Sequence, residues 1–287
     1  MSAPNFDLQS HSRHSDGALT PTEVVEAAHE AGVELLALTD HDTIDGVPAA
    51  QEAAEHRLRL IPAVEISALD RHRDLHLLGY LIDPEDGTLA QRLKSARTER
   101  EERAKRMGAR LLELGFKVFD RPLAQRQREG KSIGRPHLAA AVLAHKKNRR
   151  RLEDEGLHDV GSFIEAYLVP GAPAFVPREA PTVEEAIGWV HDAGGLAVWA
   201  HPFWDVDDPR EVVAALEEFK RHGVDGVEAF YPTHSAAQAR LLADTAQRLD
   251  LLTTGSADFH GPNHAQFSAF RAFSLHGLEP NLGPLRG

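Results

Sequence analysis

The segment that decides the fold reads Phe6-Asp7-Leu8-Gln9-Ser10-His11-Ser12-Arg13-His14-Ser15-Asp16-Gly17. Its strand-like start runs directly into a cluster of imidazole and carboxylate side chains. Similar groups follow along the chain, each at or just after an apolar run apart from His76, which lies within one. They are Thr39-Asp40-His41-Asp42, Glu65, His76, Ala200-His201-Pro202 and Ser256-Ala257-Asp258-Phe259-His260. Because imidazoles and carboxylates in this mixture commonly bind divalent ions, the set predicts a metal site.

An apolar strand next to a capped helix is the recurring theme of the chain. Thr20 reads as an N-cap, with Pro21 at the first helical position and Glu23 completing a capping box. This helix is expected to end at Gly32, and a fully buried strand is expected at 35–38. Further helices are expected to begin at Thr182, at Asp208 and near Ala236, with strands at 196–200, 226–230 and 251–254. Short connections in this alternation predict a parallel sheet.

The metal-type residues indicate that this sheet is closed. Nearly all of them follow the carboxyl ends of expected strands, which form the edge that holds the active site in α/β barrels. A sheet that gathers such residues from both ends of the sequence must curl around them. We therefore predict an α/β barrel rather than an open sheet.

A second region interrupts the alternation. Residues 88–114 form a long, highly charged helical stretch. Residues 146–151 are a basic run of the kind usually found at a solvated helix end, with a nucleic-acid contact as the alternative. We predict a discontinuous barrel domain at 1–90 and 178–280, a helical insertion at 91–177 that caps the site, and a tail at 281–287. Residues 277–287 are expected to be poorly ordered.

The composition limits the metals and the partners. The 287 residues include no Cys, so the metal ligands must be nitrogen and oxygen donors, which suit Mn, Fe, Zn or Mg. The net charge of -12 argues against binding to long nucleic acid, although bound cations would still allow a local phosphate site. No apolar run is long enough for a membrane span and no signal segment is visible, so a cytoplasmic location is expected. The sequence carries no signal for an oligomeric state.

Several of these motifs together resemble the PHP family (polymerase and histidinol phosphatase) of metal-dependent phosphoesterases. The matching motifs are Ser15-Asp16-Gly17, Leu38-Thr39-Asp40-His41-Asp42-Thr43, the strand that ends in Glu65, His76-Leu77-Leu78-Gly79-Tyr80, His201-Pro202 and Asp258-Phe259-His260. The resemblance covers nearly the whole chain and implies a distorted (β/α)7-type barrel. The helical insertion resembles the nucleotide-directed branch of the family, which contains 3',5'-nucleoside bisphosphate phosphatases and 5'-3' exoribonucleases.

The resemblance implies two or three divalent ions, with Mn first among the candidates. The first site would use Gln9, His11, Glu65 and Asp258, the second Asp16, His41 and His260, and the third Glu65, His76 and His201. The family normally has His where this chain has Gln9, and an amide oxygen is a weaker ligand than an imidazole. The first site is therefore expected to be looser, more selective for hard ions, or empty, unless His14 supplies a substitute imidazole.

The expected reaction is hydrolysis of a nucleotide phosphoester by attack of a metal-bound hydroxide. Asp40 is a candidate catalytic carboxylate or a partner of the ligands, and His234 is a candidate proton donor and phosphate contact. Arg135 and His137 resemble a segment that contacts phosphate, and Lys131 and Ser132 are weaker candidates for the same role. The expected substrate is a 3',5'-nucleoside bisphosphate or a short 5'-phosphorylated RNA.

Two other functions remain open. One is a phosphomonoesterase like histidinol phosphatase, which shares the metal cluster but does not need a base-sized pocket under a cap. The other is a non-catalytic metal-binding module, since PHP domains fused to polymerases can have degenerate metal motifs. The departure at Gln9 favours the module, whereas the remaining ligand set favours an enzyme.

Overall fold

A computed structural model describes residues 4–71, 73–128, 133–177 and 179–287. The chain divides into two compact units, of which the first comprises Met1–Lys94 with Pro181–Gly287 and the second Ser95–Ala180. The second unit covers nearly the same residues as the insertion expected at 91–177. The first unit carries the sheet and the metal-type residues, and each unit is described by itself.

The first unit is built around one seven-stranded sheet whose strands follow one another in chain order. The strands are β1 (Phe6–Asp7), β2 (Leu35–Leu38), β3 (Arg59–Asp70), β4 (Arg73–Tyr80), β5 (Leu196–Trp199), β6 (Gly226–Phe230) and β7 (Leu252–Gly255). Neighbouring strands are parallel from β1 to β3 and from β5 to β7, whereas β4 runs antiparallel to both β3 and β5.

The prediction of a wholly parallel sheet is therefore wrong at β4. Asp70 ends β3 and pairs with Arg73, the first residue of β4. A link this short can join only antiparallel strands, because a parallel crossover needs a dozen or more residues. His76 consequently lies on a strand that runs against its neighbours.

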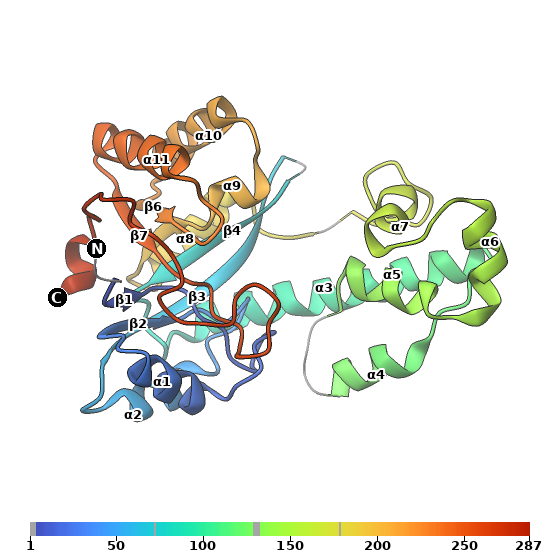
Figure 1. Ribbon diagram of the computed structural model, residues 1–287, viewed down its shortest axis with the longest axis horizontal. Helices are drawn as coiled ribbons and strands as arrows, with labels where there is room; N and C mark the ends of the chain where they lie inside the picture. The colour runs from blue at the N-terminus through green and yellow to red at the C-terminus, as the bar shows by residue number, and fades with distance from the viewer. Residues whose placement is uncertain (1–3, 72, 129–132, 178) are drawn as a thin grey trace. The chain divides into compact units, whose positions relative to one another are not determined.

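The sheet curls into a nearly closed barrel, as predicted, and its two edges meet beyond β1 and β7 (Figure 1). The backbone N–H of Leu8 donates to the carbonyl of Gly255 at 3.2 Å, and that of His11 donates to the carbonyl of Phe259 at 2.8 Å. These bonds join the segments after the first and last strands, so ligands from both ends of the chain face one another.

The helices of the first unit are α1 (Pro21–Glu30), α2 (Val47–Ala54), α8 (Val183–Asp192), α9 (Pro202–Asp205), α10 (Pro209–His222) and α11 (Ala236–Leu249), with a short 3-10 helix η2 (Gly283–Arg286). Four of them, α1, α8, α10 and α11, begin where the sequence signals place them, whereas α2 and α9 were not expected. Capping boxes at Thr20, Thr182 and Ser235 start three of them. Helices α1 and α2 pack together beside β2 and β3, and α10 and α11 pack together on the side of β6 and β7 (Figure 1).

The C-terminal segment is ordered into the barrel core, contrary to the expectation for 277–287. Leu282 and Leu285 are 2% and 0% exposed and belong to the main apolar cluster. The backbone N–H of Asn281 also donates to Thr253 Oγ1 on β7 at 2.7 Å. The expected tail therefore packs against the barrel core through its two leucines.

The second unit has a separate apolar core. The long helix α3 (Gly87–Glu113) enters it from the first unit, and α4 (Asp120–Arg128), α5 (Arg135–Leu143), η1 (Lys146–Asn148), α6 (Arg149–Asp154) and α7 (Val160–Tyr167) follow. Phe116, Phe163 and Tyr167 pack their rings at the centre of this core. The basic run at the start of α6 is solvated, with Arg149 and Arg150 paired to acidic residues one turn later. Among the residues described, no helix is both long and apolar enough to cross a membrane.

Candidate metal centre

The predicted ligands come from segments at one end of the barrel. His11 follows β1, His41 follows β2, and His201 follows β5, while Glu65 lies within β3. Isolated bridges pair Ser10 with Phe259 and His41 with Glu65, so these segments are held side by side. His201 and Asp258 have positive φ angles of 28° and 53°, a backbone conformation that is costly outside Gly and concentrates at functional sites.

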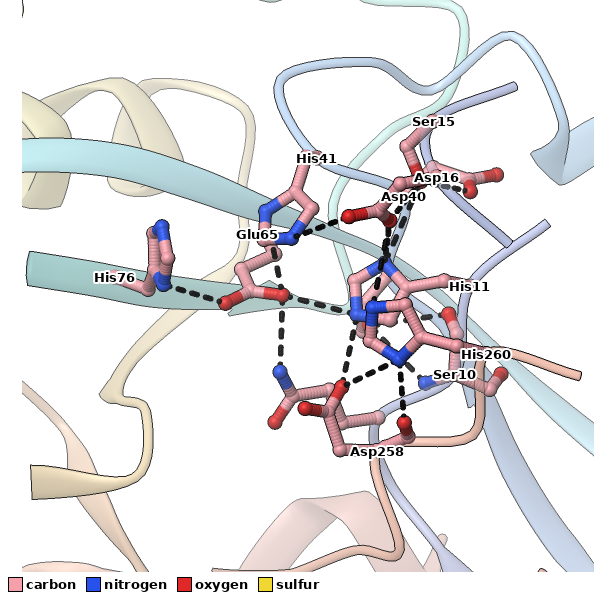
Figure 2. A network of polar contacts seen from close by, with 12 residues as sticks. Ser10, His11, Ser15, Asp16, Asp40, His41, Glu65, His76, Asp258 and His260 are labelled. Atoms are coloured by element: carbon pink, nitrogen blue, oxygen red, sulfur yellow. Dashed lines mark hydrogen bonds and ion pairs between the residues drawn. The ribbon is translucent and has the colours of Figure 1, made fainter. Parts of the chain in front are cut away.

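Glu65 is the centre of the group. Its carboxylate is fully buried, and one oxygen lies 3.1 Å from His76 Nδ1 and 3.2 Å from His201 Nε2. The other oxygen lies 3.1 Å from His11 Nε2 and 3.5 Å from His41 Nδ1. Figure 2 shows the carboxylate between His76 on one side and His11 on the other. A carboxylate whose two oxygens face separate pairs of imidazoles is arranged to bridge ions.

Three groups of side chains place their ligand atoms within 4.8 Å of one another. They are His11, Asp16, His41 and His260; His41, Glu65 and His76; and His11, Glu65 and Asp258. Each group shares residues with one of the three expected sites, but His11 and His41 each belong to two groups, and Gln9 and His201 belong to none. His201 contacts Glu65 of the second group. Gln9 also contacts Glu65, but through its amide nitrogen.

The buried ligand atoms fit divalent cations. His11 Nε2, His41 Nδ1 and Asp258 Oδ1 are buried and make no hydrogen bond within the described chain. His260 Nδ1 lies 2.6 Å from the backbone carbonyl of Asp258, which can only accept, so Nδ1 carries the proton. Loss of the proton from the other nitrogen, Nε2, which lies 3.4 Å from Asp16 Oδ1, would give a lone pair for an ion. Fixing the tautomer through the second ring nitrogen is the usual way in which proteins orient a metal-binding imidazole.

Strong electrostatic coupling accompanies this geometry. Burial raises the pKa of Glu65, but the imidazoles of His41 and His76 outweigh it and hold that pKa well below its usual value. Burial lowers the pKa of His201, whereas its contact with Glu65 raises it, and the outcome is about 9. The carboxylates are thus charged, and protons and metal ions compete for the same imidazole nitrogens. Metal binding here must release protons and strengthen as the pH rises.

Gln9 is oriented differently from a ligand. It is fully buried, and its Nε2 donates to Glu65 Oε2 at 2.9 Å. An ionised carboxylate can only accept, so the atom facing Glu65 must be the amide nitrogen. The amide oxygen lies 3.4 Å from Ser256 Oγ. His14, the possible substitute, is exposed and lies outside all three groups.

Asp40 organises the loop that carries Asp16. Its two oxygens accept from the backbone N–H of Ser12 at 2.7 Å, from Ser12 Oγ at 2.6 Å and from Ser15 Oγ at 2.7 Å. Gly17 closes the same loop, because a side chain there would overlap the carbonyl of His11. Asp40 is in none of the three groups, and its contacts are those of a positioning residue.

His234 is arranged as an acceptor rather than a proton donor. Its Nδ1 lies 3.1 Å from the carbonyl of Ala229 and therefore carries the proton. Burial, opposed by this hydrogen bond, lowers the pKa of His234 to about 4. The ring is neutral near pH 7, and its buried Nε2, which makes no hydrogen bond within the described chain, presents a lone pair. The expectation that His234 donates a proton to the leaving oxygen disagrees with this tautomer.

Arg135 and His137 belong to the second unit, at the first turn of α5. His137 Nδ1 accepts from the backbone N–H of Gly134 at 3.1 Å and so caps this helix. Their contact with a substrate phosphate stays a prediction. Lys131 and Ser132 lie outside the described residues.

Three contributors to the site were missed from the sequence. Tyr231 donates to Asp258 Oδ2 at 2.8 Å, and Asp205 Oδ2 lies 3.7 Å from His201 Nδ1. Glu228 accepts from the backbone N–H of His201 at 2.9 Å, and burial is the main reason why its pKa rises to about 8. Only Glu228 left a signal in the sequence, as a carboxylate in the middle of an otherwise apolar strand.

Comparison with known proteins identifies the family of this chain. The model of the PHP domain matches residues 7–147. A 3',5'-nucleoside bisphosphate phosphatase from Chromobacterium violaceum is 38% identical over 90% of this chain and 88% of its own. A 5'-3' exoribonuclease from Haemophilus influenzae is 34% identical over 90% of both chains.

A solved structure from Bifidobacterium adolescentis, provisionally named a metal-dependent phosphoesterase, superposes with a TM-score of 0.69 at 31% identity. The match covers 92% of this chain and 91% of that one. The likeness therefore extends over most of both units. The chain belongs to the PHP domain family and is a metal-dependent phosphoesterase.

Proposed function

We propose that this enzyme removes a phosphate from 3',5'-nucleoside bisphosphates. The observation that carries the proposal is the buried Glu65 carboxylate, which joins four imidazoles at the end of the barrel. The 38% identity to a phosphatase named for this substrate, over 90% of the chain, supports the substrate class. The net charge of -12 favours a small substrate over a long polymer.

The residues of the three groups would hold two or three divalent ions. Mn is our first candidate, with Fe, Zn and Mg as the others, because all donors are nitrogen or oxygen. Such ions supply a water that is activated near neutral pH and positive charge that stabilises the phosphoryl oxygens. Glu65 and Asp258 would hold the ions, and Asp40 fixes the loop that presents Asp16.

Side chains outside the ion sites would position the nucleotide. The guanidinium of Arg135 suits bidentate binding of the phosphate that is retained, and His137 lies two residues later in the same first turn of α5. His234 presents a lone pair and suits acceptance of a hydrogen bond from a ribose hydroxyl or an attacking water. The proton for the leaving oxygen would then come from another group or from solvent.

A 5'-3' exoribonuclease activity is the second candidate. It is favoured by the 34% identity to an enzyme of that name over 90% of the chain. Both activities break a phosphoester next to a 5'-phosphate, so one ion cluster and one phosphate subsite could serve both. The length of RNA that is accepted would distinguish them.

The test loads the protein with Mn and measures the release of phosphate or nucleotide from three substrates. The substrates are adenosine 3',5'-bisphosphate, a 5'-phosphorylated RNA trinucleotide and histidinol phosphate, at matched concentrations. We expect the bisphosphate to be hydrolysed with the highest kcat/KM. Preference for the trinucleotide would select the exoribonuclease, and preference for histidinol phosphate would overturn the nucleotide assignment. Bound metal without turnover of any substrate would indicate a non-catalytic module.

A further inference from the structure

Trp204 is an unusually exposed aromatic residue beside the metal centre. Its side chain is 51% exposed, and the other two large apolar residues exposed in the described chain, Leu112 and Phe119, belong to the second unit. Trp204 lies on α9, three residues after His201, and its backbone N–H donates to the His201 carbonyl at 2.8 Å. The indole is therefore tied by its backbone to a predicted ligand while much of its ring faces solvent.

The indole is the outer member of an aromatic group. Its ring centroid is 5.8 Å from that of Phe267 and 6.2 Å from that of Tyr231, at interplanar angles of 57° and 74°. His264 stacks on Phe267 at 5.3 Å and 13°. Phe267 and Tyr231 are 7% and 2% exposed, whereas Trp204 and His264 are exposed. Two solvent-facing rings thus flank a buried aromatic base that holds them in place.

The same group is joined to the metal centre. The hydroxyl of Tyr231 donates a hydrogen bond to Asp258, and its ring centroid lies 5.2 Å from that of His201. Phe267 and His264 contact His260, with centroid distances of 5.7 and 5.1 Å. A flat ligand on Trp204 or His264 would therefore lie one side chain away from predicted ion ligands.

We propose that Trp204, supported by Phe267 and Tyr231 and flanked by His264, is a stacking platform for the nucleobase of the substrate. The inference rests on the proposed function, because it assigns the base to this surface while the scissile phosphate lies at the ion cluster. Aromatic faces bind flat heterocycles through stacking, and every base offers such a face. The platform would accept all bases, with purines held more tightly than pyrimidines.

The test compares substrates with and without a base. Kinetics are measured on adenosine 3',5'-bisphosphate and on 1,4-anhydroribitol 3,5-bisphosphate, its base-free counterpart, for the wild type, Trp204→Leu and Trp204→Phe. Loss of one base stack predicts an increase of about tenfold in KM for the nucleotide in Trp204→Leu, with kcat nearly unchanged. The base-free substrate should be unaffected, and Trp204→Phe should recover most of the loss. Equal effects on both substrates, or no effect on either, would overturn the proposal.

Fluorescence separates the platform from the chemistry. The difference in emission between the wild type and Trp204→Leu reports on this indole, and Trp189→Phe, on α8, is the control for loss of another tryptophan. Adenosine 5'-phosphate should quench the Trp204 emission, whereas ribose 5-phosphate should not. If adenosine 5'-phosphate quenches the emission but the protein hydrolyses no phosphoester, the stacking platform would be supported and the proposed function would be refuted. If the nucleotide is hydrolysed but quenching does not depend on the base, the proposed function would be supported and the stacking platform would be refuted.

Discussion

Glu65 connects most of the candidate metal centre, and Asp258 completes one side of it. Asp258 Oδ1 lies 3.0 Å from His11 Nε2 and makes no hydrogen bond within the described chain, while Oδ2 is held by Tyr231. One oxygen is thus positioned by the protein and the other is left for an ion. This division is what a carboxylate ligand requires.

Asp258→Asn should abolish most of the turnover without unfolding the protein. The amide keeps the shape and a contact with Tyr231, but it loses the charge that binds the ion. We expect kcat to fall by at least about a hundredfold, since loss of even the outer partners of metal ligands costs 10–100-fold. Asp250→Asn, at the exposed end of α11, is the matched control and should retain full activity. Activity of Asp258→Asn within a fewfold of the wild type would exclude Asp258 as a ligand.

Gln9→His should increase the number of bound ions by about one per chain. Gln9 directs its amide nitrogen at Glu65, whereas an imidazole there could offer a lone pair to the site formed by His11, Glu65 and Asp258. The measurement is metal per chain by elemental analysis after Mn loading and desalting. His14→Ala should leave the ratio unchanged. An unchanged ratio in Gln9→His would mean that the first site is already complete in the wild type.

His234 should make stability sensitive to acid. Its pKa is lowered from 6.5 to about 4 in the folded protein, chiefly by burial, so the unfolded chain binds a proton more readily. Stability is therefore full above about pH 6.5 and is lost as the pH falls toward 4, by about 3 kcal/mol in all. Urea unfolding of the metal-free protein between pH 7 and 4 should show a smaller loss in His234→Asn. The exposed His29→Asn is the control, and equal slopes in the wild type and His234→Asn would refute this account.

At the scale of elements, the starts of helices with a capping signal were predictable and strand direction was not. The capping boxes at Thr20 and Thr182 are local hydrogen-bond patterns, so the sequence alone specifies them. The apolar run of β4 contains no local signal that says whether the strand is parallel or antiparallel to β3. Only the short link after Asp70 shows that β4 is antiparallel to β3. The ordered C-terminal segment was also missed, because burial of Leu282 and Leu285 depends on distant residues of the barrel.

The candidate ligands were predictable because they follow strands, whereas their partners were not. Residues after parallel strands meet at one edge, which is why His11, His41 and Asp258 could be grouped before the structure. The orientation of Gln9 and the tautomer of His234 depend on atoms contributed by other segments, such as Glu65 and the Ala229 carbonyl. No spacing rule in the sequence encodes these contacts.

The N-terminus of α5 provides a prediction about the insertion. Arg135→Ala should raise KM for adenosine 3',5'-bisphosphate by about tenfold or more, because a charge-assisted, bidentate contact to the 5'-phosphate is lost. The KM for p-nitrophenyl phosphate, which lacks a second phosphate, should stay the same. Arg150→Ala, in the solvated basic run of α6, is the matched control. Equal increases for both substrates would remove Arg135 from the 5'-phosphate subsite.

At the scale of the whole molecule, the net charge opposes the binding of a nucleotide, whereas metal ions at the cluster would favour it. A net charge of -12 repels nucleotides at long range, and cations bound at the end of the barrel would reverse this field locally. Without those cations, the cluster of carboxylates would itself repel a phosphate. Metal occupancy and substrate hydrolysis should therefore rise together.

The most direct measurement titrates Mn into chelator-treated protein and records bound metal and phosphate release from adenosine 3',5'-bisphosphate on the same samples. The account predicts no activity in the metal-free protein, and activity that rises with occupancy until two or three ions are bound per chain. Undiminished hydrolysis after complete metal removal would contradict the central claim. Full occupancy without hydrolysis of this or any other phosphoester would contradict it equally.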